Sequence, residues 1–112
     1  MENIKNILVE KYNLNTYCNE FGNIYADNKL INCVVSSPHE GNDYRYLIRF
    51  STVSAFDRWA NSTAIEEFFS TKEEVINYLR ENELNIYKQL LEYLSEEYAE
   101  LEKSWEEECK YL

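Results

Sequence analysis

The chain has 112 residues, of which 45% are hydrophobic and 29% are charged, as in an ordinary globular domain with one core. No stretch approaches the roughly 20 apolar residues that a membrane span requires, and the N-terminus lacks the basic and apolar regions of a secretory signal. Two glycines exclude a glycine-rich phosphate-binding loop, and a net charge of −10 disfavours direct binding of nucleic acid. We therefore expect a single acidic domain over residues 1–112, located in the cytoplasm and without contact to a membrane.

Residues 1–13 are predicted to form a helix, because Ile4, Ile7, Leu8 and Tyr12 repeat at the spacing of one helical face. From 14 to 69 the pattern is mainly that of β-strands. Short runs rich in β-branched and aromatic residues alternate there with turn signals. Strands are expected at 16–20, 23–26, 29–36 and 44–53. The short connections favour an antiparallel meander of three to five strands.

The strand expected at 44–53 has two different faces. Tyr44, Tyr46, Ile48 and Phe50 share one face, and Arg45, Leu47 and Arg49 share the other. This alternation is typical of an antiparallel sheet with one buried face and one face in water. In the preceding strand, Cys33 shares a face with Ile31 and Val35, which predicts a packed thiol.

Residues 54–69 fit two patterns. The stretch 55–60 could open a helix capped by Ser54, or it could form a further strand. A turn at 61–63 would then lead into 64–69. We favour a strand or an extended segment over this region.

Residues 70–112 are predicted to be helical. Two overlapping capping boxes, Ser70 with Glu73 and Thr71 with Glu74, begin a helix that runs to about Glu81. After an interruption at 82–85, a long helix is expected to run to the end of the chain. Its apolar residues occupy the a and d positions of a heptad repeat: Leu84, Tyr87, Leu91, Leu94, Tyr98, Leu101, Trp105 and Leu112.

The first half of this long helix has a wider apolar face, because Ile86, Leu90 and Tyr93 add to the heptad positions. We expect this half to pack against the sheet and the second half to project or to lie along the surface. The predicted fold class is therefore α+β. A small antiparallel sheet of three to five strands is combined with an N-terminal helix and a long acidic C-terminal helix.

Three cysteines and one histidine give little support for a metal or a nucleophile. Cys18, Cys33, His39 and Cys109 are too widely spaced to match a zinc motif, in which ligands come in close pairs. His39 lies in the loop 36–43, and nothing in the sequence places a cysteine beside it. We expect reduced thiols, no metal, no cofactor and no enzymatic activity.

Acidic residues are concentrated near the C-terminus. The segment 92–108 contains eight glutamates and one lysine, so its net charge is −7. As a helix it is about 24 Å long, a length over which one DNA strand carries about seven phosphates. Glu92 with Glu96 and Glu96 with Glu100 are like-charge pairs that disfavour the helix locally. An acidic face of this kind is either a solvated surface or a recognition surface.

The recognition hypothesis is strengthened by ten tyrosines and two tryptophans, because Tyr and Trp are enriched in protein interfaces. In size and charge alone, the chain is similar to small acidic inhibitors that phages use against restriction or CRISPR nucleases, and to immunity proteins that block nuclease toxins. We therefore expect a protein-binding inhibitor that occupies a basic groove of a nucleic-acid-binding enzyme. The predicted partner-binding residues are Glu92, Tyr93, Glu96, Glu97, Glu100, Glu106, Glu107 and Tyr111.

The alternative is a structural or adaptor module that assembles through the C-terminal heptads. Parallel self-pairing is disfavoured, because Glu97 at position g would face Glu102 at position e of its partner. Self-association is therefore not expected, although an antiparallel pair or a basic partner helix stays open.

Overall fold

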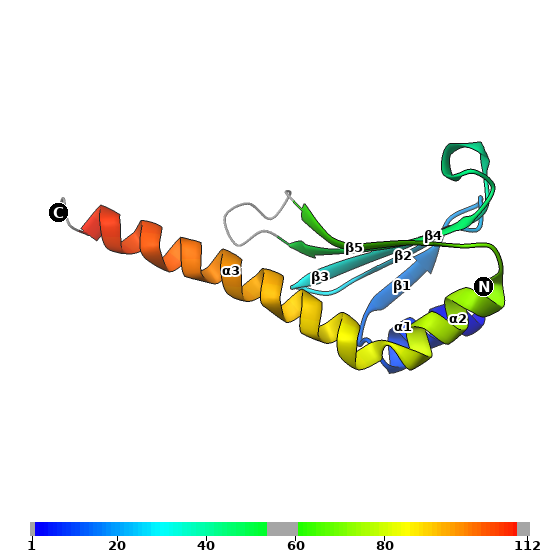
Figure 1. Ribbon diagram of the computed structural model, residues 1–112, viewed down its shortest axis with the longest axis horizontal. Helices are drawn as coiled ribbons and strands as arrows, with labels where there is room; N and C mark the ends of the chain where they lie inside the picture. Colours follow the sequence, from blue (N-terminus) through cyan, green and yellow to red (C-terminus); the bar gives the residue numbers. More distant parts are fainter. Residues whose placement is uncertain (1, 54–60, 110–112) are drawn as a thin grey trace.

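The computed structural model describes residues 2–53 and 61–109 and has the predicted α+β architecture (Figure 1). Its elements in chain order are α1 (Glu2–Glu10), β1 (Asn15–Cys18), β2 (Ile24–Asp27), β3 (Ile31–Ser36), a short 3-10 turn (Glu40–Asn42), β4 (Tyr46–Val53), β5 (Asn61–Phe69), α2 (Lys72–Glu81) and α3 (Glu83–Cys109). The strands form one antiparallel meander in the order β1-β2-β3-β4-β5. The five strands agree with the upper end of the predicted range.

The helices lie together on one face of the sheet, so the molecule has two layers (Figure 1). The core lies between them and contains Ile24, Cys33, Val35, Ile48 and Phe50 from the sheet, all buried. The helices contribute buried residues at helical spacing: Ile4, Ile7, Leu8, Val75, Leu79, Ile86 and Leu90. This arrangement buries the apolar stripe of each helix against the apolar face of the strands. Cys33 is packed, as its alternation with Ile31 and Val35 predicts.

The end of α1 differs from the predicted one, whereas the start of α2 falls at one of the two predicted capping boxes, each for a local reason. α1 ends at Glu10 rather than at 13, and Asn13 adopts a left-handed backbone with φ of 52°. Asparagine is one of the few residues that tolerates this conformation after a helix end. α2 begins at Lys72 because Thr71 is its N-cap, with its hydroxyl accepting a hydrogen bond of 3.2 Å from the Glu74 amide. The break at Asn82 separates α2 from α3, as expected.

The start of β4 also differs from the predicted start of this strand at residue 44. The strand begins at Tyr46, so Tyr44 does not share its face as predicted. Asp43 and Tyr44 both have φ of 56°, and this left-handed pair turns the chain out of the loop before the strand starts. Tyr44 is exposed as a result.

The favoured interpretation of 64–69 as a strand is confirmed, but the turn expected at 61–63 is wrong, because β5 already begins at Asn61. The expectation for 54–60 falls outside the described residues. A bulge in β5, between the pairs of Phe50 and Ser51, places one extra residue in that strand.

In the described part of the chain, no helix has a run of apolar residues sufficient to span a bilayer.

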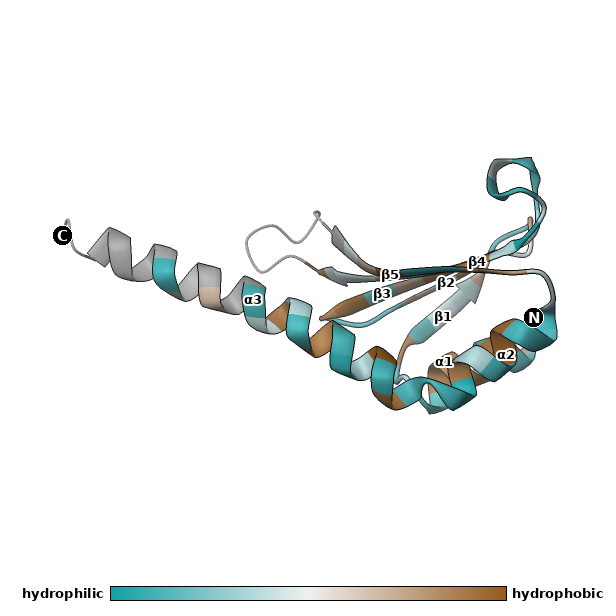
Figure 2. Cartoon of the chain, viewed as in Figure 1, coloured by the Kyte–Doolittle hydropathy of each residue, from teal (hydrophilic) through white to brown (hydrophobic). Residues whose placement is uncertain are grey.

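The heptad interpretation of α3 is wrong at two positions. Leu84 and Leu91, predicted to lie in the apolar seam, are 82% and 60% exposed. The buried stripe consists of Ile86, Leu90 and Leu94, four residues apart, with Tyr87 beside it. A straight helix packed on a sheet has a period of 3.6 residues, so its contact line drifts away from positions seven apart. In Figure 2 the first half of α3 accordingly alternates between hydrophobic and hydrophilic residues.

Candidate protein-binding surfaces

On the acidic face of α3, the structure describes the glutamate side chains of Glu92 and Glu96. Both are exposed, and they lie one turn apart. Neither carboxylate forms an ion pair within the described residues. Among the described positions of α3, Leu94 is the last that is buried. The predicted residues Glu97, Glu100, Glu106 and Glu107 belong to the same helix, but their side chains lie outside the described part, as does Tyr111 altogether.

Tyr93 lies at one margin of this acidic face, and Leu91 lies at the other. Residues of an α-helix follow each other at about 100°, so the arc from Leu91 through Glu92 to Tyr93 spans about 200° of the helix circumference. Tyr93 is three residues before Glu96, a spacing that places the two side chains next to each other. The exposed side chains of Glu92, Tyr93 and Glu96 therefore lie in one patch on α3. The structure adds exposed Leu91, which the heptad pattern had placed in the core.

A second surface is the face of the sheet opposite the helices, which we call the free sheet face. One row of side chains runs across it at paired positions: Tyr17, Tyr25, Val34, Arg49 and Glu66. None of these residues is buried. The rings of Tyr17 and Tyr25 stack with centroids 5.2 Å apart, and Arg49 Nε lies 3.0 Å from Glu66 Oε2.

A neighbouring row of the free sheet face pairs Leu47 with Phe68. The guanidinium carbon of Arg45 lies 4.6 Å from the centre of the Phe68 ring, and its Nη2 is 3.5 Å from Asp43 Oδ2. Because both arginines have a carboxylate partner, this face is nearly neutral. Aromatic and arginine side chains are enriched in protein interfaces. The alternation of residues in 44–53 predicted that one face of the sheet is in water. The pairing of side chains between neighbouring strands could not be predicted, because it depends on the strand register, which the sequence does not specify.

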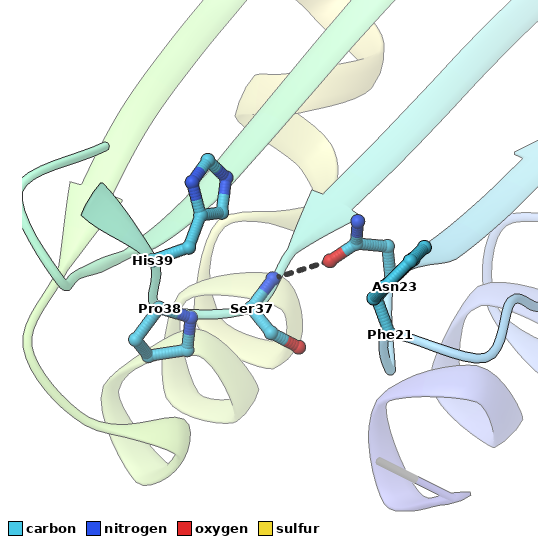
Figure 3. Close-up of a pocket in the computed structure, with 5 residues that line it drawn as sticks. All are labelled: Phe21, Asn23, Ser37, Pro38 and His39. Carbon is cyan, nitrogen blue, oxygen red and sulfur yellow. Dashed lines mark hydrogen bonds between the residues drawn. The ribbon is translucent and has the colours of Figure 1, made fainter. Parts of the chain in front are cut away.

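Figure 3 shows a pocket at the end of the sheet where the β1–β2 turn meets the β3–β4 loop. It has a volume of about 360 Å³ and is lined by Phe21, Asn23, Ser37, Pro38 and His39. Asn23 Oδ1 accepts a hydrogen bond of 2.9 Å from the Ser37 amide, and the Ser37 hydroxyl donates to the Gly22 carbonyl at 2.9 Å. These hydrogen bonds hold the two loops together, so the Asn23 side-chain oxygen and the Ser37 hydroxyl are engaged within the fold.

His39 contacts Ser36, the last residue of β3, but the geometry opposes a catalytic pair. The Gly41 amide donates to His39 Nδ1 at 3.0 Å, so that nitrogen carries no proton in the neutral ring. The proton is then on Nε2, which lies 3.2 Å from Ser36 Oγ. A ring that donates from Nε2 cannot accept the serine proton, as a general base must. His39 therefore acts as the cap of the 3-10 turn.

The thiols of Cys18 and Cys33 lie in different environments. Cys18 is exposed on the edge strand β1, whereas Cys33 is buried in the core, and burial raises the pKa of the Cys33 thiol. Within 2–53 and 61–109, no three His, Cys, Asp or Glu side chains gather closely enough to hold a metal ion. Cys109 has no described side chain.

Comparisons of the chain with protein-family models, with curated proteins and with solved structures found no match. The surfaces described above are therefore the observations that bear on function. Two of them, the acidic face of α3 and the free sheet face, have the composition of protein-binding surfaces.

Proposed function

We propose that this protein is an acidic inhibitor that binds a basic, nucleic-acid-binding surface of a target nuclease. It would belong to the phage anti-defence kind, directed against CRISPR or restriction enzymes, or to the nuclease-immunity kind. The observation that carries the proposal is the course of α3, which continues past Leu94 to Cys109 and extends beyond the sheet (Figure 1). The molecule is 55 Å long but only 27 and 22 Å in its other dimensions.

Charge density supports this proposal. The segment 92–108 has a net charge of −7 over about 24 Å of helix, which is close to the phosphate density along one DNA strand. A basic groove that binds nucleic acid would therefore meet a similar field along this helix. Because Glu92 and Glu96 form no ion pair within the described part of the chain, their charges are free to meet a partner.

Rigidity supports it as well. A helix holds its side chains at fixed spacing, so less conformational entropy is lost on binding than in an acidic disordered tail. The like-charge pair Glu92–Glu96 lowers helix stability by a few tenths of a kcal/mol, a cost that a partner would relieve. In this proposal the protein is not an enzyme, requires no cofactor, binds no nucleic acid itself and acts in the cytoplasm of a bacterial or phage-infected cell.

The test is differential capture from bacterial lysate by the immobilised wild-type protein and by the double variant Glu92→Gln, Glu96→Gln. We expect the wild type to retain a nucleic-acid-binding enzyme and the variant to retain less of it. Duplex DNA should displace this enzyme from the immobilised protein. The free protein should inhibit its nuclease activity. Association should slow steeply as salt is added, since exposed charges are screened beyond about 8 Å at physiological ionic strength.

The matched control is Glu10→Gln with Glu20→Gln, which removes the same charge from exposed positions in α1 and in the β1–β2 turn. This control should capture the enzyme as well as the wild type does. If the α3 variant and the control associate equally fast with the captured protein at low salt, the acidic face is only a solvated surface and the proposal is wrong.

A second candidate is an adaptor that assembles through α3, and it is favoured by the exposure of Leu84 and Leu91. Paired helices would cover these two residues, which lie seven positions apart as in a coiled coil. Light scattering over a range of concentrations separates the two functions. An inhibitor stays monomeric until its basic target is added, whereas an adaptor of this kind gains mass with concentration.

A further inference from the structure

An apolar pocket lies between the β2–β3 turn and the first half of α3. It has a volume of about 150 Å³, and its walls include Leu30 from the turn and Tyr87, Leu91 and Leu94 from the helix. Leu30 and Leu91 are 46% and 60% exposed, so two leucines stand at the rim of one cavity. Exposed leucines scattered singly are normal, but two that border one apolar cavity are typical of a binding site.

Both walls of the pocket are anchored to the fold. Asn28 Oδ1 accepts hydrogen bonds from the Leu30 and Ile31 amides at 2.8 and 2.9 Å, which fixes the turn. On the opposite wall, the Tyr87 hydroxyl donates to the Lys11 carbonyl at 2.7 Å. The pocket is therefore present before a partner binds, and this lowers the entropic cost of binding.

The charged side chains next to the two rim leucines are lysines. Lys29 directly precedes Leu30 in the turn. Lys88 lies one turn before Leu91, at about 60° from it around α3. Both lysines are exposed, and neither forms an ion pair within 2–53 and 61–109. The rim is therefore positively charged, although the chain as a whole is acidic.

The acidic residues closest in sequence lie on other faces of the molecule. Glu92 follows Leu91 at about 100° around the helix, on the side away from Leu94. Asp27 ends β2 and shares the free sheet face with Tyr25. Neither carboxylate lines the pocket. Charge complementarity at the pocket therefore favours an anionic group, whereas the acidic face of α3 favours a basic one.

The size of the pocket indicates what it can hold. Sites for small molecules usually have roughly 300–1,000 Å³, so about 150 Å³ is small for a drug-sized ligand or a lipid. It suits a single apolar side chain, the kind of anchor that protein interfaces bury at their centre. Lysine carries its ammonium on a flexible stem of four carbons, so Lys29 and Lys88 can reach acidic residues beside such an anchor.

We propose that this pocket is a docking site for an acidic segment of a partner protein. One apolar side chain of that segment enters the cavity between Leu30 and Leu91. Its neighbouring aspartates or glutamates lie against Lys29 and Lys88. The proposal goes beyond the inhibitor function and does not depend on it, because it concerns a surface whose charge preference is opposite to that of the acidic face of α3.

A second copy of this chain fits the pocket less well, although its own α3 is acidic. Leu91 and Leu94 of the pocket adjoin the segment 92–108, which has a net charge of −7. The α3 helix of another copy would bring the same segment beside it, and close like charges oppose association. A different acidic protein is therefore the favoured occupant.

The probe for the test is a synthetic amphipathic helical peptide of leucine and glutamate, labelled for fluorescence anisotropy. Binding is measured at physiological ionic strength, where charges more than about 8 Å apart are largely screened, so that the overall negative charge of the chain does not mask a local attraction. One control peptide has the same composition in scrambled order. A second control peptide has lysine in place of each glutamate.

The apolar wall is tested with Leu91→Ser and its matched control Leu84→Ser, the same change at an exposed leucine of α3 outside the pocket. Both variants should retain the circular dichroism spectrum of the wild type. We expect Leu91→Ser to weaken binding of the acidic peptide about tenfold, because covering the exposed part of one leucine contributes about that much to an association constant. Leu84→Ser should change it less than about twofold.

The rim charges are tested with Lys29→Gln plus Lys88→Gln. The matched control is Lys5→Gln plus Lys72→Gln, which removes the same charge from α1 and α2. The rim variant should weaken binding of the acidic peptide about threefold relative to this control, as expected for two exposed ion pairs. In about 0.5 M salt this difference should vanish, while the loss in Leu91→Ser should persist because the anchor is uncharged.

The inference is overturned if Leu91→Ser binds the acidic peptide as tightly as Leu84→Ser, or if the rim variant binds it as tightly as its lysine control. It is also overturned if the scrambled peptide or the lysine peptide shows the same dependence on Leu91. A dimer in light scattering that Leu91→Ser dissociates would identify a second copy as the occupant and would contradict an acidic partner. The proposed function is tested separately, through Glu92→Gln with Glu96→Gln, so either proposal can fail without the other.

Discussion

The Tyr12 hydroxyl donates a hydrogen bond of 2.7 Å to the carbonyl oxygen of Leu79 in the last turn of α2. Carbonyls in the last turn of a helix have no partner within it, so the tyrosine supplies one. Tyr12 is fully buried, and its ring stacks on Tyr87 with centroids 5.4 Å apart. This one side chain therefore connects the segment after α1 to both α2 and α3.

The first prediction is that Tyr12→Phe lowers the free energy of unfolding by about 1–3 kcal/mol. The substitution keeps the ring but leaves a buried carbonyl without its partner, which costs about that much. Urea denaturation provides the measurement. Tyr44→Phe, at an exposed tyrosine, should change stability by less than about 0.5 kcal/mol. Equal effects at the two positions would mean that the Tyr12 hydrogen bond contributes nothing.

The second prediction concerns the buried side of α3. Ile86→Ala should cost about 2–5 kcal/mol, because it leaves a cavity at a fully buried position. Leu84→Ala, two residues earlier, should stay within about 0.5 kcal/mol of the wild type. Thermal or urea unfolding of the two variants measures the difference. The heptad pattern places Leu84 in the apolar seam, so a larger loss at Leu84 than at Ile86 would restore that interpretation.

The third prediction is a loss of stability at alkaline pH. Burial, and after it the carboxylate of Glu67, raise the pKa of Tyr78 to about 12 from its ordinary value of 10.0. The unfolded chain therefore releases this proton first, so the stability from Tyr78 is fully present below pH 10 and falls as the pH rises toward 12.

Urea unfolding at about pH 9 and about pH 11 tests this dependence. Tyr78→Phe should lose less stability between the two values than the wild type does. Tyr17→Phe, which removes an exposed tyrosine, is the control and should lose as much as the wild type. An unchanged pH dependence in Tyr78→Phe would contradict the assignment.

The fourth prediction concerns the thiols. Maleimide should modify Cys18 rapidly in the folded protein and Cys33 only after unfolding, because the thiolate is the reactive form and Cys33 is buried. Peptide mass spectrometry before and after urea treatment distinguishes the two sites. Reductant and chelator should leave the melting temperature unchanged, as expected for a fold without a disulfide or a metal. A shift of several degrees with either reagent would contradict that expectation.

Several features of the fold could be predicted from local patterns alone. The alternation in 44–53 predicted a sheet with one wet face, Thr71 and Glu74 predicted the start of α2, and turn signals predicted a meander. These patterns are reliable because they depend on neighbours within a few residues, where backbone geometry dictates the spacing. The concentration of glutamates over 92–108 is likewise a property of the sequence.

What only the tertiary structure decided is which apolar residues of α3 are covered. Leu84, Ile86, Leu90 and Leu91 are all apolar, and the sequence pattern makes the stripe wider than the sheet can cover. Packing of α3 against β4 and β5 buries Ile86 and Leu90 and leaves Leu84 and Leu91 exposed. The apolar pocket between the β2–β3 turn and α3 arises in the same way, because it joins Leu30 to Leu91 from distant parts of the chain. Periodicity specifies that a helix has an apolar face, but packing against a particular neighbour determines how much of that face is buried.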